Sequence, residues 1–126
     1  MDCTYTCLEN NIHAFVVHKA TRQAVDEYLT SLKTICDDCN PDEPLRLLVD
    51  LSPDGLPPMR YVVSAGQKFY TRYTVAPVMR AAFLYQDGLI LPIAESLMHL
   101  LRARTTRRAF HIEQRDKAIE WLLSGD

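Results

Sequence analysis

The chain has 126 residues, of which 48% are hydrophobic and 24% are charged, and its formal net charge is −2. These values are typical of one globular domain and exclude a disordered or fibrous chain. The charge gives no general attraction to nucleic acid or to an anionic membrane, and no apolar run reaches the ~20 residues that a membrane-spanning helix needs. No basic and apolar export segment follows Met1, so we expect a single cytoplasmic domain over residues 1–126.

The first half of the chain predicts a hairpin, a helix and a buried strand. Residues 3–8 and 12–18 have strand composition with a turn signal between them, which predicts an opening β-hairpin. Thr21 is a candidate N-cap for a helix over about 22–36 that carries one apolar stripe. The run at 45–51, rich in Leu and Val, predicts the third strand.

The second half predicts three more helices that alternate with two strands. The proline pair before Met59 suits the first turn of a second helix, and residues 79–85 form the next predicted strand. A third helix follows Asp87-Gly88, with Pro92 tolerated in its first turn and its apolar residues from Ile93 to Leu101 facing inward. A short strand at 107–112 comes next, and residues 116–123 form a closing helix. The order ββαβαβαβα predicts an α/β fold with a mostly parallel five-stranded sheet, an antiparallel edge and four helices.

The most informative stretch is Leu45-Arg-Leu-Leu-Val-Asp-Leu-Ser52, which precedes Pro53-Asp-Gly-Leu-Pro-Pro58. An apolar run that ends in polar residues before a Pro/Gly break is typical of a buried parallel strand reaching the carboxyl edge of a sheet. Ligands and regulatory contacts concentrate at such edges. We therefore predict a regulatory or partner-binding site at this edge, made of Asp50, Ser52, Asp54 and Gly55.

The element order, the strand exit at Asp50–Ser52 and the closing segment Glu113-Gln-Arg-Asp-Lys-Ala-Ile-Glu-Trp-Leu-Leu123 together resemble the SpoIIAA-like branch of the STAS superfamily. In element order the resemblance covers nearly the whole chain. It implies a STAS-type α/β sandwich that works as a non-enzymatic module. Family members act as anti-sigma-factor antagonists switched by serine phosphorylation; others are appended to anion transporters, and related domains are proposed to bind nucleotides or lipids.

The switching members of that family carry the pattern Asp-Ser-Ser-Gly, and their second serine is phosphorylated at the start of the second helix. By its offset from Asp50, Ser52 takes the place of that serine. This chain departs from the pattern, since Leu51 replaces the first serine and Pro53-Asp54 separate Ser52 from Gly55. A kinase that docks on the tight turn would meet a different backbone here.

The chemistry of Ser52 itself leaves two interpretations open. Its hydroxyl could cap the following helix or a local turn, which is the commoner use of serine. Alternatively, Ser52, Asp50 and nearby backbone N–H groups make a small polar pocket. Phosphorylation would then add about −1.5 to −2 charges beside Asp50 and Asp54, repelling an acidic partner and attracting an arginine. No motif ties a histidine to Ser52 as a catalytic triad would need, so we expect no enzyme.

Cysteines and histidines give no strong sign of a metal or redox site. Cys36-Asp-Asp-Cys39 is a C-x-x-C motif, and Cys3 and Cys7 share one side of the first strand, which suggests a four-thiolate zinc site. The motif ends a helix, however, and its two aspartates would raise the thiol pKa values. We favour burial of Cys3, Cys7 and Cys36 as small apolar side chains. The four histidines are scattered, which predicts solvated or singly hydrogen-bonded imidazoles; we expect no metal and no cofactor.

One local concentration of positive charge precedes the end of the chain, at Arg102, Arg104, Arg107 and Arg108. A solvated loop between helix and strand explains it adequately. The alternative is a contact for a phosphate or an acidic partner, because arginine binds such groups in a bidentate manner. A nucleic-acid site would need interleaved aromatic residues and a basic domain, and the sequence has neither.

Two functions follow from these features. The first is regulation through contact with another protein at the edge around Asp50–Leu56, with phosphorylation of Ser52 as a switch. The second is binding of a small apolar or anionic ligand, of the lipid or nucleotide class, in a pocket near that edge or in a groove between the second and third helices. A homodimer is slightly preferred over a monomer.

Overall fold

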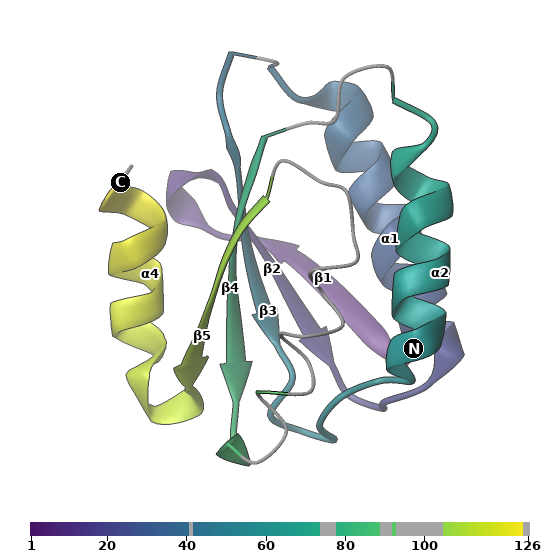
Figure 1. The fold of residues 1–126 in the computed structure, drawn as a ribbon. Helices are drawn as coiled ribbons and strands as arrows, with labels where there is room; N and C mark the ends of the chain where they lie inside the picture. The colour runs from purple at the N-terminus through teal and green to yellow at the C-terminus, as the bar shows by residue number, and fades with distance from the viewer. Residues whose placement is uncertain (41, 74–77, 89–91, 93–104, 125–126) are drawn as a thin grey trace.

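The computed structural model describes residues 1–40, 42–73, 78–88, 92 and 105–124. Its sheet has five strands in the order β1-β2-β3-β4-β5 (Figure 1). The strands are β1 (Cys3–Cys7), β2 (Ile12–Val17), β3 (Leu45–Asp50), β4 (Met79–Tyr85) and β5 (Thr105–His111). β1 pairs antiparallel with β2, and every other neighbouring pair is parallel. The predicted mostly parallel sheet with an antiparallel edge is confirmed.

Helices cover both faces of this sheet. The described residues form three α-helices rather than the four expected: α1 (Arg22–Asp38), α2 (Met59–Tyr70) and α4 (Arg115–Ser124). The short 3-10 turns η1 (Glu9–Asn11) and η3 (Ile112–Gln114) precede β2 and α4. α1 and α2 lie side by side on one face, and α4 covers the other (Figure 1). The third predicted helix lies outside the described residues except for Pro92 in its predicted first turn.

The central strand β3 has both of its faces in the core. It pairs with β2 on one side and β4 on the other, so that Val49 lies between Phe15 and Phe83. Successive side chains of a strand point to opposite faces. Leu47 therefore packs beneath α1 and α2, while Leu48 packs beneath α4. The prediction that this run is a buried parallel strand is confirmed.

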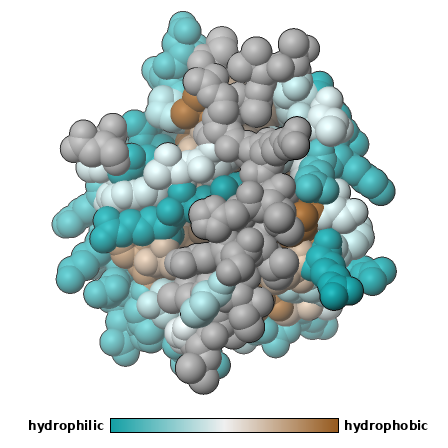
Figure 2. Space-filling view, viewed as in Figure 1, coloured by the Kyte–Doolittle hydropathy of each residue, from teal (hydrophilic) through white to brown (hydrophobic). Residues whose placement is uncertain are grey.

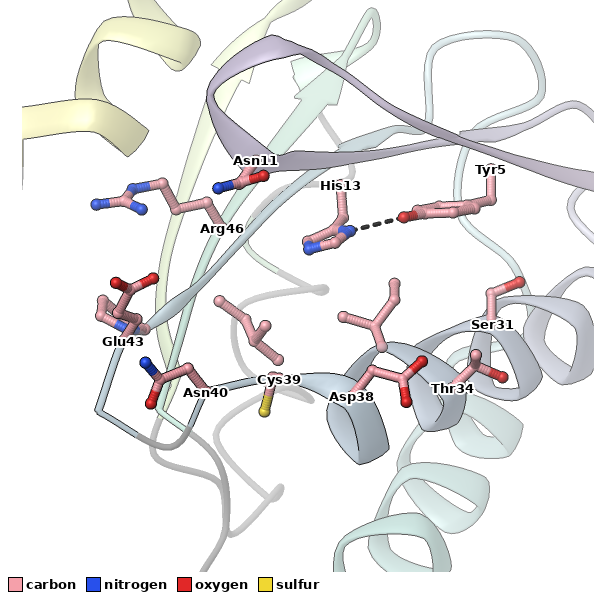
Figure 3. A pocket seen from close by; sticks show the side chains of 13 residues that line it. Tyr5, Asn11, His13, Ser31, Thr34, Asp38, Cys39, Asn40, Glu43 and Arg46 are labelled. Atoms are coloured by element: carbon pink, nitrogen blue, oxygen red, sulfur yellow. Dashed lines mark hydrogen bonds between the residues drawn. The ribbon is translucent and has the colours of Figure 1, made fainter.

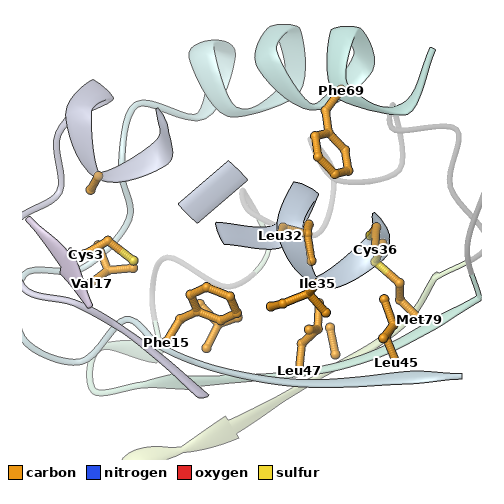
Figure 4. Close-up of a cluster of buried hydrophobic side chains, with 13 residues drawn as sticks. Cys3, Phe15, Val17, Leu32, Ile35, Cys36, Leu45, Leu47, Phe69 and Met79 are labelled. Atoms are coloured by element: carbon orange, nitrogen blue, oxygen red, sulfur yellow. The ribbon is translucent and has the colours of Figure 1, made fainter. Parts of the chain in front are cut away.

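The larger core cluster joins the sheet to α1 and α2. Figure 4 shows Leu32 of α1 and Phe69 of α2 directed toward the sheet, where Phe15, Leu47 and Met79 meet them. Each of these side chains is almost fully removed from solvent. Burial of one such side chain stabilises the fold by about 1.5–3 kcal/mol, so this layer holds the two helices in place.

The start of α1 agrees with its sequence signal, whereas the start of α2 does not involve a side-chain cap. The Thr21 hydroxyl accepts a hydrogen bond of 3.1 Å from the backbone N–H of Ala24, which confirms Thr21 as the N-cap of α1. Pro58 occupies the N-cap position of α2, and no side chain accepts a hydrogen bond there. The proline pair thus ends just before the helix instead of forming its first turn.

Two arginines from neighbouring strands hold the end of α4. Arg46 Nε donates to the carbonyl oxygen of Leu122 at 2.9 Å, and Arg80 Nε donates to that of Trp121 at 3.0 Å. Arg80 also donates to the Ser124 hydroxyl, and its guanidinium lies 4.1 Å from the centre of the Trp121 ring. A helix C-terminus carries partial negative charge. Arg80, only 8% exposed, therefore finds compensation there for its burial.

Removing the Arg80 charge while keeping its apolar stem should destabilise the protein. We expect Arg80→Met to lower the free energy of unfolding by about 2 kcal/mol, because the hydrogen bonds to the α4 terminus and the stacking on Trp121 are lost. Urea unfolding followed by far-UV circular dichroism measures the difference. Arg115→Met, at the exposed start of α4, is the matched control and should change stability by less than about 0.5 kcal/mol. Equal effects of the two substitutions would contradict this account.

Candidate functional site

The predicted site residues lie in a tight turn directly after β3. Asp50 Oδ1 accepts a hydrogen bond of 2.9 Å from the backbone N–H of Ser52. The N–H of Gly55 donates to the carbonyl oxygen of Leu51 at 2.9 Å and closes the turn. Asp54 Oδ2 accepts from the backbone N–H of Ala20 at 2.7 Å, which ties the turn to the loop between β2 and α1. Asp50 thus holds the turn by a hydrogen bond within it, and Asp54 holds the turn against the neighbouring loop.

The hydroxyl of Ser52 has no partner among the residues that the structure describes. The residue is partly exposed, its N–H is bonded to Asp50, and its hydroxyl makes no hydrogen bond with any other described residue. Ser52 lies seven residues before α2 begins at Met59, so it cannot cap that helix. The described contacts do not support the interpretation in which the Ser52 hydroxyl caps the helix or a local turn, because Asp50 instead accepts the hydrogen bond from the Ser52 N–H.

Gly55 permits the turn through its backbone conformation. Its φ angle is +77°, a left-handed conformation that costs other residues energy. A Cβ atom added there would meet no heavy atom within 4 Å. Backbone strain, rather than crowding, therefore accounts for glycine at this position.

We expect Gly55→Ala to destabilise the protein by about 1 kcal/mol through this strain alone. Gly88→Ala is the matched control, because a Cβ there would lie 3.6 Å from the Tyr85 ring, an ordinary contact, and its φ is not left-handed. Thermal unfolding of the two variants measures the difference. A Gly55→Ala variant as stable as Gly88→Ala would show that the turn has another conformation.

Of the four arginines that the sequence singled out, the structure describes Arg107 and Arg108, and these two do not lie together. Arg107 and Arg108 lie inside β5, which begins at Thr105, so they point to opposite faces of the sheet. Arg108 lies 5.0 Å over the Phe110 ring on the α4 face. Arg102 and Arg104 lie outside the described residues. The structure therefore does not bring Arg107 and Arg108 together as a shared contact for an anion.

The cysteines have different environments. Cys3 and Cys36 are buried as predicted, whereas Cys7 is exposed at the end of β1, so its predicted burial was wrong. Cys39 is half-buried, and its thiol donates to the carbonyl oxygen of Cys36. Burial raises the pKa of the Cys3 and Cys36 thiols from 9.0 to about 11, which keeps both protonated near neutrality. Within the described residues, no three or more His, Cys, Asp or Glu side chains converge as a metal ion would need.

These buried thiols predict a loss of stability at alkaline pH. Because their pKa values are raised from 9.0 to about 11, the two thiols keep their protons to a higher pH in the folded state than in the unfolded state. The stabilisation is complete below pH 9 and is lost as pH rises through about 11. Melting temperatures measured across this range should fall less steeply for a Cys3→Ala/Cys36→Ala variant than for the parent. The Cys7→Ala control should keep the parental slope, and a double variant that also keeps it would refute the assignment.

The described histidines each make one side-chain hydrogen bond, as predicted. The Thr4 hydroxyl bonds to Nε2 of His18, and Nδ1 of His111 accepts from the N–H of Glu113. A 2.7 Å hydrogen bond joins the Tyr5 hydroxyl to Nδ1 of His13. Burial lowers the pKa of His13 from 6.5. His99 lies outside the described residues.

His13 and Tyr5 line a groove that was not predicted from the sequence. The groove has a volume of about 500 Å³ and lies between the C-terminal half of α1 and the first residues of β2 and β3 (Figure 3). Leu45 and Arg46 begin β3 at this groove, whereas Asp50 ends β3 at the Ser52 turn. The groove is therefore at the opposite end of the sheet from the predicted site. Its residues come from the hairpin, α1 and the following loop, so no local motif marks it.

Figure 2 shows a mostly hydrophilic described surface on one face of the molecule, with hydrophobic residues visible only in small areas. The large hydrophobic residues with high exposure among those described are Met1, Tyr5, Val78 and Leu123, which belong to separate segments. We therefore look to the polar turn and the groove, rather than to an apolar patch, for function.

Comparison with known proteins found no match among protein-family models, curated proteins or solved structures. None of the helices that the structure describes is long and apolar enough to cross a membrane.

Proposed function

We propose that the protein is a non-enzymatic regulatory module that binds another protein through the Ser52 turn, in the manner of the SpoIIAA-like STAS domains that its sequence resembles. We place this activity in the cytoplasm. The observation that carries the proposal is a serine hydroxyl that bonds to no other residue described by the structure, on a turn that Asp50 and Asp54 hold in place.

The buried strand beneath the turn supports a recognition role. β3 carries four buried residues and hydrogen bonds to a parallel neighbour on each side, so the chain leaves the core in a fixed direction at Asp50. A partner that binds a preorganised turn loses less conformational entropy than one that must order a flexible loop. A polar turn of this kind suits a regulated contact.

Phosphorylation would act on this turn through charge. A phosphate on Ser52 would break no internal hydrogen bond of the hydroxyl, and it would add about −1.5 to −2 charges beside Asp50 and Asp54. The favourable field of a helix N-terminus fades within the first turn, and α2 begins only at Met59. We therefore infer that the phosphate would work by repelling an acidic partner surface rather than by stabilising α2.

The second function predicted from the sequence was binding of a small apolar or anionic ligand near this edge. The described groove does not support it there, because the groove lies at the other end of β3. Regulation by protein contact remains the better-supported proposal for the Ser52 turn.

Affinity purification of the full chain from its native cells tests the proposal, with mass spectrometry reading both bound proteins and phosphate. We expect the parent protein and Ser52→Ala to retain one partner, and Ser52→Glu to lose it through charge repulsion. Ser64→Glu, at an exposed position of α2, is the control and should retain the partner. Retention by Ser52→Glu, with no phosphate on Ser52 in the parent protein, would overturn the proposal.

A further inference from the structure

We propose that the groove at the amino end of β3 binds a small organic amine. Its ammonium group would face the carboxylate of Asp38, and its hydrocarbon part would lie against Tyr5 and His13, across the groove from Asp38 (Figure 3). This site shares no residue with the Ser52 turn and does not depend on the function proposed for it.

The size and the walls of the groove suit a small molecule. Its volume of about 500 Å³ lies within the range of roughly 300–1,000 Å³ found for small-molecule sites. Tyr5 and His13 lie on one side, and Thr34 and Asp38 of α1 lie on the other (Figure 3). Ile35 and Leu45 contribute apolar surface to the lining. A ligand with both a hydrocarbon part and a polar head matches this combination.

Tyr5 and His13 form an ordered aromatic wall. Their rings stack with a centroid distance of 5.8 Å and an angle of 18° between planes, and the hydrogen bond between them fixes both rings. Tyr5 also packs against Phe15 at 5.2 Å, which supports the ring from the core side. Aromatic faces attract cations as well as hydrocarbon. Because burial lowers the pKa of His13, the imidazole stays neutral near pH 7 and does not repel a cation.

The charge of the groove favours a cationic head group. Asp38 is the last residue of α1, where the helix dipole adds negative potential, and the last turn contains no basic residue. Neighbouring Asp37 is engaged by Lys33 at 3.4 Å. Asp38 and Glu43, in contrast, form no ion pair with any residue that the structure describes.

Arg46 borders the same groove but does not neutralise it by an ion pair. Its Nε donates to the carbonyl oxygen of Leu122 in α4, on the other face of the sheet. Figure 3 shows its guanidinium directed away from Asp38. Two carboxylates disfavour an anionic ligand such as a nucleotide. The described side chains also do not converge in the way that a metal site requires, so an organic amine fits best.

Titration calorimetry of the full chain with three phenyl-bearing probes of similar size but different charge tests this assignment. We expect phenethylamine to bind, the neutral phenethyl alcohol to bind at least about tenfold more weakly, and the anionic hydrocinnamate to bind more weakly still. NMR shifts on phenethylamine addition should centre on Tyr5, His13 and Thr34. Equal binding of all three probes, or no binding of the amine at millimolar concentration, would overturn the proposal.

Single substitutions test whether the amine binds to this particular site or is attracted only by the overall negative charge of the region. Asp38→Asn should weaken phenethylamine binding about fivefold or more, while Asp42→Asn, in the loop after α1 and outside the lining, should leave it unchanged. Tyr5→Phe should retain most of the affinity and Tyr5→Leu should lose it, because the ring rather than the hydroxyl contacts the ligand. An effect of Asp42→Asn as large as that of Asp38→Asn would refute the site. Thermal melts confirm that each variant is folded.

Discussion

Burial of β3 on both faces is the constraint on which both sites depend. A shift of one residue in its pairing would exchange the two faces of the strand and move Arg46 and Asp50 into the apolar layer beneath α1 and α2. That exchange would bury two charged groups without partners, which is strongly unfavourable. Only one pairing register of β3 is therefore favourable, and this register determines which residue leaves the core at each end of the strand.

The face of the sheet beneath α4 shows how charged residues fit into such strands. Arg46 and Arg80 occupy paired positions of β3 and β4, and both donate to the last turn of α4. The helix terminus supplies the acceptors and the negative potential that the arginines need. Arg46 also borders the groove, and its hydrogen bond to α4 directs its guanidinium away from Asp38, so the packing of α4 contributes to the charge of the groove.

Features that rest on local pattern were predictable, and features that rest on tertiary contact were not. Thr21 as a cap and β3 as a buried strand follow from a few neighbouring residues, and both are confirmed. The groove is different, because Tyr5 meets His13 only after hairpin pairing, and Asp38 joins them only when α1 docks. The prediction that Cys7 is buried was wrong for a similar reason. The alternation of side chains along a strand predicts which face of the sheet Cys7 lies on, but it does not predict where the helix that covers this face ends.

The two proposed sites should act independently of each other. At roughly 3.3 Å per residue, the six residues of β3 hold the Ser52 turn and the groove about 17 Å apart. Exposed charges at that separation lie about two Debye lengths apart at physiological ionic strength and interact weakly. Mechanical coupling would require β3 to change its register or its docking, which burial of both faces opposes. A phosphate at one end of the strand should therefore leave the affinity for an amine at the other end nearly unchanged.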